Sequence, residues 1–306
     1  MPSTINTGVT LRGLNGTFFP KFEAANVLWR LLCSLVQSDG ASETYKWLGQ
    51  LPMPNEWKGS RRSKALGDFG QTLVNQHWES MLEIDRDEYA DDQTGQLAVR
   101  TAEMATRFAQ HPDKILVDLI EAAESTACYD GQYFFDTDHV EGDSGSQSND
   151  LTYDVATPAD PTASEFEKAF WQAVEALVGF VDDQGEPWNL FTDFEQMEGL
   201  LVMVPKNMLR VASQVLGVNA APIIDSTSNI LAGRAKVVTT PRLSWTTKFS
   251  VFKVDDAMRP LIFQQRQQVQ TQIKDDPEEK PVKYMADARY AVGYGLWQKA
   301  TLTTLT

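Results

Sequence analysis

A long amphipathic stretch from Gln96 to Ala123 constrains the fold of this chain more than any other feature. Its apolar residues recur at intervals of seven and four, which predicts a helix of about thirty residues, long for a globular protein. Pro112 lies inside this stretch and predicts either a kink or the start of a second helix. The repeating positions are Leu97, Met104, Phe108, Ile115 and Leu119. A helix of this length needs other elements to pack along it, so we expect it to act as a spine.

Composition restricts the class of protein. The net charge of −15 and the pI of about 4.6 argue against a surface that grips DNA, although an acidic protein can still lie beside DNA. The two cysteines, Cys33 and Cys128, favour buried free thiols in a reducing compartment, although a single disulfide remains an alternative. The N-terminal residues do not resemble a signal peptide, and no apolar run approaches about 20 residues. We therefore expect a soluble protein made in the cytoplasm, with no membrane partner.

The first hundred residues divide into three parts. Residues 1–22 are weakly patterned and predict an extended arm, and residues 23–37 predict a short amphipathic helix that contains Cys33. Residues 44–95 predict a long excursion with two strands, basic in one part and acidic in another. Such charges fit pairing between neighbouring copies, and the alternative is two solvated charged faces. The candidate inter-subunit contacts are Trp47, Trp57, Lys58, Arg61, Arg62, Lys64, Asp85, Asp87, Glu88, Asp91 and Asp92.

The second half of the chain mixes helices and strands, which predicts an α+β fold rather than a regular βαβ series. Residues 141–160 predict a loop, and Ser164 with Glu167 predicts a capping box that opens a helix. Strands are expected at 199–204 and 245–254, with a helix from Pro205 to Gly217 between them. Residues 260–273 predict an extended pair around a bend, and the last residues predict one long strand.

The search for catalytic chemistry gives little. Cys128, Asp136, Asp138 and His139 are close in sequence but lack the paired spacing of structural zinc sites, and residues 136–142 match a calcium loop poorly. Cys128 with His139 as a base would suit a hydrolase, but a cysteine at the end of an apolar helix is more often a packing residue. The GDSG tetrapeptide at 142–145 lies in a polar linker. We therefore expect no catalytic residue, no cofactor and no metal.

Four segments occur in a specific order and spacing: YKWLG at 45–49, EWKG at 56–59, IDRDEYADD at 84–92 and CYDGQYFFDTDH at 128–139. Together they resemble the major head (capsid) subunits of Mu-type tailed phages, and ARYAVGYGLWQKA resembles the aromatic strand of that family. The matching motifs span about residues 44–306.

The resemblance implies the HK97-like fold, with boundaries that we place on this chain as follows. The N-terminal arm would be 1–43, the extended loop 44–95, the peripheral domain with the spine helix 96–159, and the axial domain 160–240. Residues 241–306 would return as strands that complete both domains. In shells of this kind the extended loop reaches onto a neighbouring subunit.

The resemblance also implies a function: a capsid subunit that forms hexamers and pentamers and closes into an icosahedral virion shell around double-stranded DNA, assembled in the host cytoplasm. Its partners would be further copies of itself, a separate scaffold or protease, a portal and decoration proteins, with DNA as a non-specific neighbour. Closure would be non-covalent, because no motif supports a crosslink from Lys58 or Lys64. The alternatives are an encapsulin-like protein compartment and a Cys/His hydrolase.

Overall fold

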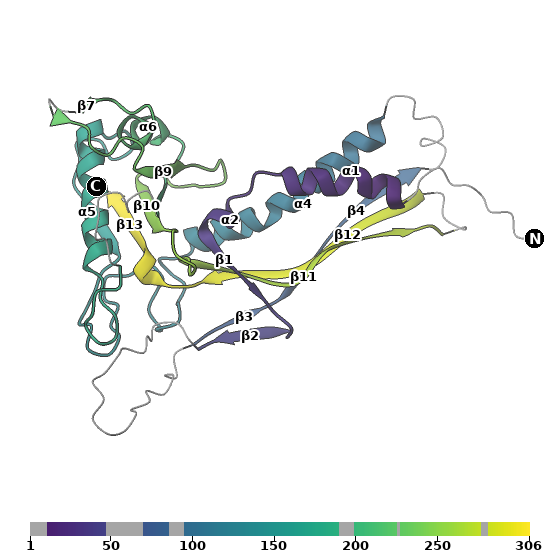
Figure 1. Cartoon of the computed structure of the whole chain (residues 1–306), viewed down its shortest axis with the longest axis horizontal. Coiled ribbons are helices and arrows are strands. Elements are labelled where there is room, and N and C mark those ends of the chain that lie inside the picture. The colour runs from purple at the N-terminus through teal and green to yellow at the C-terminus, as the bar shows by residue number, and fades with distance from the viewer. Residues whose placement is uncertain (1–10, 47–69, 86–94, 190–198, 225–226, 277–280) are drawn as a thin grey trace, which may run out of the picture.

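The computed structural model describes residues 11–46, 70–85, 95–189, 199–224, 227–276 and 281–306. Figure 1 shows two parts at an angle to each other: a long, thin arm and a body at one end of it. Two helices lie along one face of a twisted sheet in the arm. The body holds a second sheet covered by helices α5 and α6. Both parts combine helices with sheets, so the predicted α+β class is confirmed.

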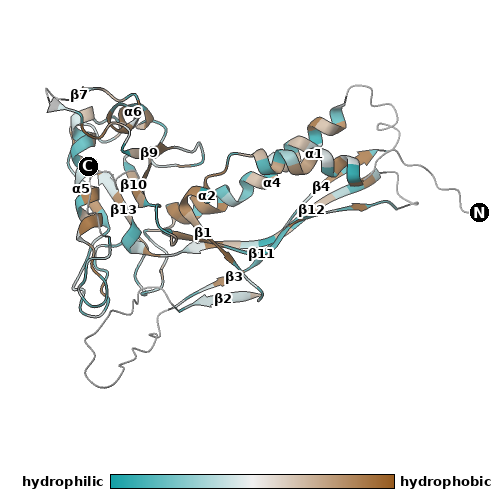
Figure 2. Cartoon of the chain, viewed as in Figure 1, coloured by the Kyte–Doolittle hydropathy of each residue, from teal (hydrophilic) through white to brown (hydrophobic). Residues whose placement is uncertain are grey.

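The spine of the arm is α4 (Gln96–Glu121), a single helix that contains Pro112. The prediction of a long helix is confirmed, and the structure shows one continuous helix rather than two. Met104, Phe108 and Leu116 are buried in this helix, and Figure 2 shows hydrophobic and hydrophilic residues alternating along it. Burial of this stripe is the main source of helix stability, because isolated helices gain little from propensity alone.

The N-terminal prediction was wrong in its described part. Residues expected to be extended form helix α1 (Leu11–Ala24), which lies beside α4 (Figure 1). The stretch contains two glycines and Pro20, so its intrinsic helix propensity is low. Phe18 is fully buried and meets the ring of Tyr284 edge-on, with ring centroids 6.0 Å apart. Tertiary burial of an aromatic face thus overrides local propensity.

The arm sheet has the strand order β1-β11-β12-β4. β1 runs parallel to β11, whereas β12 pairs antiparallel with both β11 and β4. Within 23–37 only the end of α1 and the short helix α2 (Trp29–Leu32) are helical, and residues 33–37 form β1, so the helix predicted there was largely wrong. The extended pair predicted at 260–273 is one strand with two register irregularities. The strand bounds are β1 (Cys33–Gln37), β4 (Gln76–Asp85), β11 (Leu261–Lys274) and β12 (Pro281–Tyr294).

The body sheet has the strand order β5-β13-β10-β6-β9. The strands predicted near 199–204 and 245–254 are confirmed as β6 and β10. β5 falls in the predicted loop, and the expected single terminal strand is divided into β12 and β13 by a 3-10 turn, Trp297–Lys299. The strand bounds are β5 (Asp150–Tyr153), β6 (Leu200–Met203), β9 (Ala235–Val238), β10 (Lys248–Lys253) and β13 (Ala300–Leu305).

Two helices cover the body sheet, α5 (Ala163–Gly179) and α6 (Leu209–Leu216). The capping box exists, but it joins Thr162 to Glu165 rather than Ser164 to Glu167. Gly217 ends α6 as predicted, whereas Pro205 lies in the turn before the helix. The remaining strands form two small pairs: β2 (Ser42–Tyr45) with β3 (Gln71–Val74), and β7 (Ile223–Ile224) with β8 (Thr227–Ser228).

None of the described helices is both long and apolar enough to cross a membrane. The spine connects arm to body near its C-terminal end, where Lys248 of β10 forms an ion pair with Glu124 at 2.6 Å. The division of the chain into arm, loop, peripheral and axial domains stays a prediction. The pairing of β4 bears on its boundaries: β4 lies within the proposed extended loop, yet it pairs along its whole length with β12 of the arm.

Candidate assembly surfaces and a buried polar cluster

The β2–β3 hairpin lies mostly within the proposed extended loop, 44–95, and residues 47–69 of that loop lie between its two strands in the sequence. Its base is fixed to the arm. The hydroxyl of Tyr45 donates to Oε1 of Gln264 at 2.7 Å, and Nε2 of Gln264 donates to Oδ1 of Asn75 at 2.8 Å. Gly293 lies directly against Leu73, so close that a Cβ at Gly293 would be 2.3 Å from a Leu73 methyl group. The loop therefore starts from a firmly held base.

Most of the predicted contact residues lie outside the described part of the chain. Asp85, the exception, is the last residue of β4 and lies opposite Pro281 of β12. The pairing of the predicted contact residues with a neighbouring copy stays a prediction. The residues outside the described ranges are Trp47, Trp57, Lys58, Arg61, Arg62, Lys64, Asp87, Glu88, Asp91 and Asp92.

The arm is held together by polar contacts that sequence reasoning did not find. The carboxylate of Asp113 on α4 accepts the backbone N–H groups of Leu28 and Trp29, both at 2.8 Å. These N–H groups open α2, where donors lack partners within the helix. The spine thus satisfies the start of another helix and fixes where the chain enters β1.

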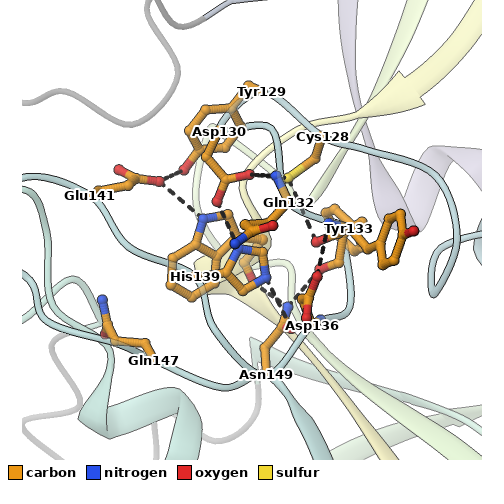
Figure 3. A network of polar contacts seen from close by, with 12 residues as sticks. Cys128, Tyr129, Asp130, Gln132, Tyr133, Asp136, His139, Glu141, Gln147 and Asn149 are labelled. Carbon is orange, nitrogen blue, oxygen red and sulfur yellow. Dashed lines mark hydrogen bonds and ion pairs between the residues drawn. The ribbon is translucent and has the colours of Figure 1, made fainter.

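A buried polar cluster lies where the spine passes into the turn at 128–149, beneath the junction of β12 and β13. Asp130 is its centre (Figure 3). One carboxylate oxygen of Asp130, Oδ2, lies 2.7 Å from Nδ1 of His139. The other, Oδ1, accepts a hydrogen bond from the thiol of Cys128 at 3.0 Å. The His139 imidazole is fully buried and stacks on Trp297, with ring centroids 4.0 Å apart. Its Nε2 lies 3.3 Å from Oδ1 of Asn149.

Glu141 extends the cluster toward the body. Its Oε1 accepts hydrogen bonds from the hydroxyl of Tyr129, the indole N–H of Trp297 at 3.0 Å and the side-chain amide of Gln298 at 3.1 Å. Burial raises the pKa of Glu141, although the hydrogen bonds from Tyr129 and Trp297 act in the opposite direction. Burial, and next the charge of Glu141, raise the pKa of Tyr129. The cluster therefore joins the 128–149 turn to the 3-10 turn that separates β12 from β13.

The geometry does not favour nucleophilic chemistry at Cys128. Burial is the main cause that raises the pKa of this thiol, and Asp130 raises it further, so the sulfur stays protonated. Its hydrogen bond goes to Asp130 rather than to His139, and Asp130 separates the two. A nucleophile and its base need a direct hydrogen bond, which this arrangement does not provide.

Cys128, Asp130 and His139 are the one group among the described residues whose ligand atoms could meet at a metal, since these atoms lie within 4.8 Å of one another. The distances fit hydrogen bonds better. Two ligand atoms on a tetrahedral zinc are separated by about 3.3 Å, because each lies about 2.0 Å from the ion. The 2.7 Å between His139 and Asp130 is shorter than that and typical of a charge-assisted hydrogen bond.

Only part of this cluster was visible from sequence. Sequence patterns drew attention to Cys128, Asp136, Asp138 and His139 but not to three further members, Glu141, Asn149 and Gln298. Asn149 and Gln298 are fully buried and far apart in the chain, so no local pattern reveals them. The one available signal was an acid, Glu141, in a turn rich in aromatic residues.

Comparison with known proteins assigns the chain to a family. The family model described as the Mu-like prophage major head subunit gpT matches residues 9–159 and 244–305. The chain belongs to this family. The two matched ranges contain the spine, the β2–β3 hairpin, the polar cluster and all of β10 to β13. The unmatched range from 160 to 243 contains α5, β6, α6 and β9 of the body.

Two curated relatives agree with this assignment. A 111-residue segment is 40% identical to the Mu-like prophage FluMu major head subunit of Haemophilus influenzae and covers 36% of each chain. A 117-residue segment is 34% identical to the major capsid protein of Escherichia phage Mu and covers 38% of each chain. The aligned segments thus span little more than a third of either relative.

The fold agrees with solved capsid structures. The chain aligns with a subunit from the procapsid of bacteriophage JBD30 with a TM-score of 0.54 and 21% identity, over 97% of this chain and 76% of that one. At this identity the likeness is one of fold, and it confirms the HK97-like architecture expected from the resemblance.

Proposed function

We propose that this chain is the structural subunit of a phage head, which assembles as hexamers and pentamers into an icosahedral shell around double-stranded DNA. The observation that carries the proposal is the match of the head-subunit family model to the arm, the hairpin and the polar cluster. The virion is its site of action, and the host cytoplasm is where it assembles.

The shape of the subunit supports the proposal. The arm is a thin unit of two layers, helices on a sheet, that extends away from the body, as Figure 1 shows. A shell gains stability from such a shape, because each copy can bury several interfaces of roughly 1,600 Å² with its neighbours. The mechanism is therefore burial of surface between copies rather than catalysis.

Partners follow from the same proposal. The subunit contacts further copies of itself, a separate scaffold or protease during assembly, a portal at one vertex and decoration proteins outside. DNA is a non-specific neighbour, because the net charge of −15 disfavours tight binding to phosphate. Closure is non-covalent.

Electron microscopy of the purified chain, alone and with its scaffold partner, tests the proposal together with the mass from light scattering. Shells tens of nanometres across, or rings of five and six copies, are expected. A monomer or dimer under both conditions would contradict it. Shells that carry protein cargo and exclude nucleic acid, judged by their absorbance ratio, would favour the compartment alternative.

A matched pair of variants tests the loop. Deletion of residues 52–66 should leave a soluble subunit that forms no shells, because the loop can no longer reach a neighbour. Replacement of the same residues by a Gly/Ser segment of equal length keeps the length of the loop and removes its side chains. It therefore shows which of the two assembly requires. Normal shells from the deletion would exclude the loop as an assembly contact.

A further inference from the structure

A cleft of about 760 Å³ lies between the spine and the body. Its walls are α4 at Gln110 and Asp113, the segment 26–31, and residues 236–242, which include part of β9 and the chain after it. We call it the β9 cleft. β9 is the edge strand of the body sheet and, among the described strands, pairs with β6 alone. One line of its backbone N–H and C=O groups therefore points away from the sheet.

The β9 cleft carries positive charge in an acidic protein. Lys236 and Arg242 line it, and within the described ranges neither forms an ion pair within 4.0 Å. Asp113 is the carboxylate in the cleft, but both its oxygens already accept the N–H groups of Leu28 and Trp29. The described lining therefore holds two cations and one carboxylate, so its charge is positive on balance.

The positive character continues along the arm. Gln110 also lines a groove of about 690 Å³ between α1 and α4, so the two hollows adjoin. Across both, the described lining holds four cations and two carboxylates: Lys236, Arg242, Lys21, Arg107, Asp113 and Glu103. Charge complementarity thus calls for an acidic occupant.

The chain itself contains such a segment. Residues 87–92 read DEYADD and carry four carboxylates and no cation. This segment connects β4 to α4, and the end of β4 and the start of α4 both lie at the end of the arm farthest from the body (Figure 1). It is the complement in charge to the cleft, and the described residues that flank it lie at the opposite end of the same spine.

The segment cannot reach the β9 cleft of its own chain. Gln110 lies fourteen residues after Gln96, or about 21 Å along the helix axis. The four carboxylates lie within four residues of Asp85 or of Gly95, and four extended residues span at most about 14 Å. A second copy must supply the contact.

We propose that the β9 cleft receives the acidic segment 87–92 of a neighbouring copy. The inference rests on the proposed function, because it makes the contact a step in shell assembly. Segment and cleft are different surfaces of one subunit, so each copy donates to the next in a head-to-tail contact. Contacts of this type close into rings when the rotation between copies allows it.

Charge reversal tests the contact in assembly. Lys236→Glu with Arg242→Glu should abolish or strongly reduce shell formation, and so should Asp87→Lys with Asp91→Lys. A chain that carries all four changes should recover shells, because the attraction is restored with opposite signs. Failure of the fourfold variant to recover, while both double variants fail, would overturn the proposal and indicate a different occupant, such as a scaffold or DNA.

A matched control uses two exposed cations elsewhere on the body, outside the lining of the cleft: Lys206→Glu with Arg210→Glu. The change in net charge is the same as in the cleft variant. Adding Asp87→Lys and Asp91→Lys to this control should give no recovery, and recovery there would show a general effect of net charge instead of a specific contact.

A binding assay separates this inference from the proposed function. A labelled peptide of residues 85–94, added to the unassembled full chain, should bind with an affinity that falls as salt is raised. Lys236→Glu with Arg242→Glu should weaken binding by roughly tenfold or more. Equal binding by the wild type and the cleft variant, or no binding by either, would overturn the cleft contact even if the wild type forms normal shells.

Discussion

The imidazole Nδ1 of His111 on the spine lies 2.8 Å from the hydroxyl of Tyr290 on β12, which joins the helical layer of the arm to its sheet. Trp78 of β4 packs against the same imidazole, with ring centroids 4.5 Å apart. Burial, and then the charges of Lys114 and Arg242, lower the pKa of His111 below its usual 6.5. The folded arm therefore favours the neutral ring.

This linkage predicts that the arm loses stability in mild acid. Below pH 6.5 the unfolded chain binds the His111 proton before the folded chain does, so the free energy of unfolding falls as pH drops through that range. His111→Gln should reduce this slope, measured by urea unfolding at pH 5 and pH 7. Tyr290→Phe is the control: it should cost about 1 kcal/mol and keep the slope, because the imidazole remains. An unchanged slope in His111→Gln would refute the assignment.

The contact between Gly293 and Leu73 predicts a coupled pair. Gly293→Ala should destabilise the subunit by about 1–3 kcal/mol, because its Cβ would overlap the Leu73 side chain. Leu73→Ala alone also destabilises, since Leu73 is buried. In the double variant the overlap is gone, so the two costs should not add. Denaturant unfolding of all four chains measures this coupling, and strict additivity would show that the two residues do not press on each other.

The hydrogen bonds to Glu141 predict that removal of the acceptor oxygen costs more stability than removal of the charge alone. Glu141→Ala should cost about 3 kcal/mol, because it leaves the buried donors of Tyr129, Trp297 and Gln298 without their shared oxygen. Glu141→Gln keeps a carbonyl oxygen and should be far milder. Thermal unfolding of both variants measures the difference, and equal losses would contradict the role of Oε1.

The raised pKa of Glu141 also makes the free energy of unfolding depend on pH. The folded chain holds this proton to higher pH than the unfolded chain, so the group makes folding less favourable as pH rises above its ordinary 4.5. This contribution should disappear in Glu141→Gln. The test is the difference in unfolding free energy between wild type and variant, followed from pH 4.5 to pH 7; a difference that does not vary with pH would argue against a raised pKa.

Both cysteines should resist alkylation in the folded subunit. Cys33 and Cys128 are buried and free, and burial raises the pKa of each thiol. Mass spectrometry after iodoacetamide treatment should show an unmodified native protein and two labels after denaturation. Rapid labelling of Cys128 in the native state would reopen the case for a reactive thiol.

The elements that sequence predicted well are those whose apolar pattern is visible within the element itself. The spine shows its own apolar stripe, and β6 is a short apolar run that is buried on both faces. The four ordered motifs were sufficient to indicate the family, because their residues and spacing are present in the chain itself.

The elements that were missed depend on distant partners. Residues 11–24 fold as a helix because Phe18 finds Tyr284, and Cys33–Gln37 form a strand because β11 lies alongside in parallel register. In each case the partner is more than 200 residues away, so no window around the segment contains the information. The cluster around Glu141 and Gln298 was invisible for the same reason.

The position of β13 affects how the protein is made. Residues 300–305 form a strand between β5 and β10, and β1, encoded far earlier in the chain, pairs with β11. The body sheet cannot be completed without β13, and the arm sheet cannot be completed without β11 and β12. A chain that folds as it is synthesised therefore leaves both sheets incomplete until residues 261–305 have been made.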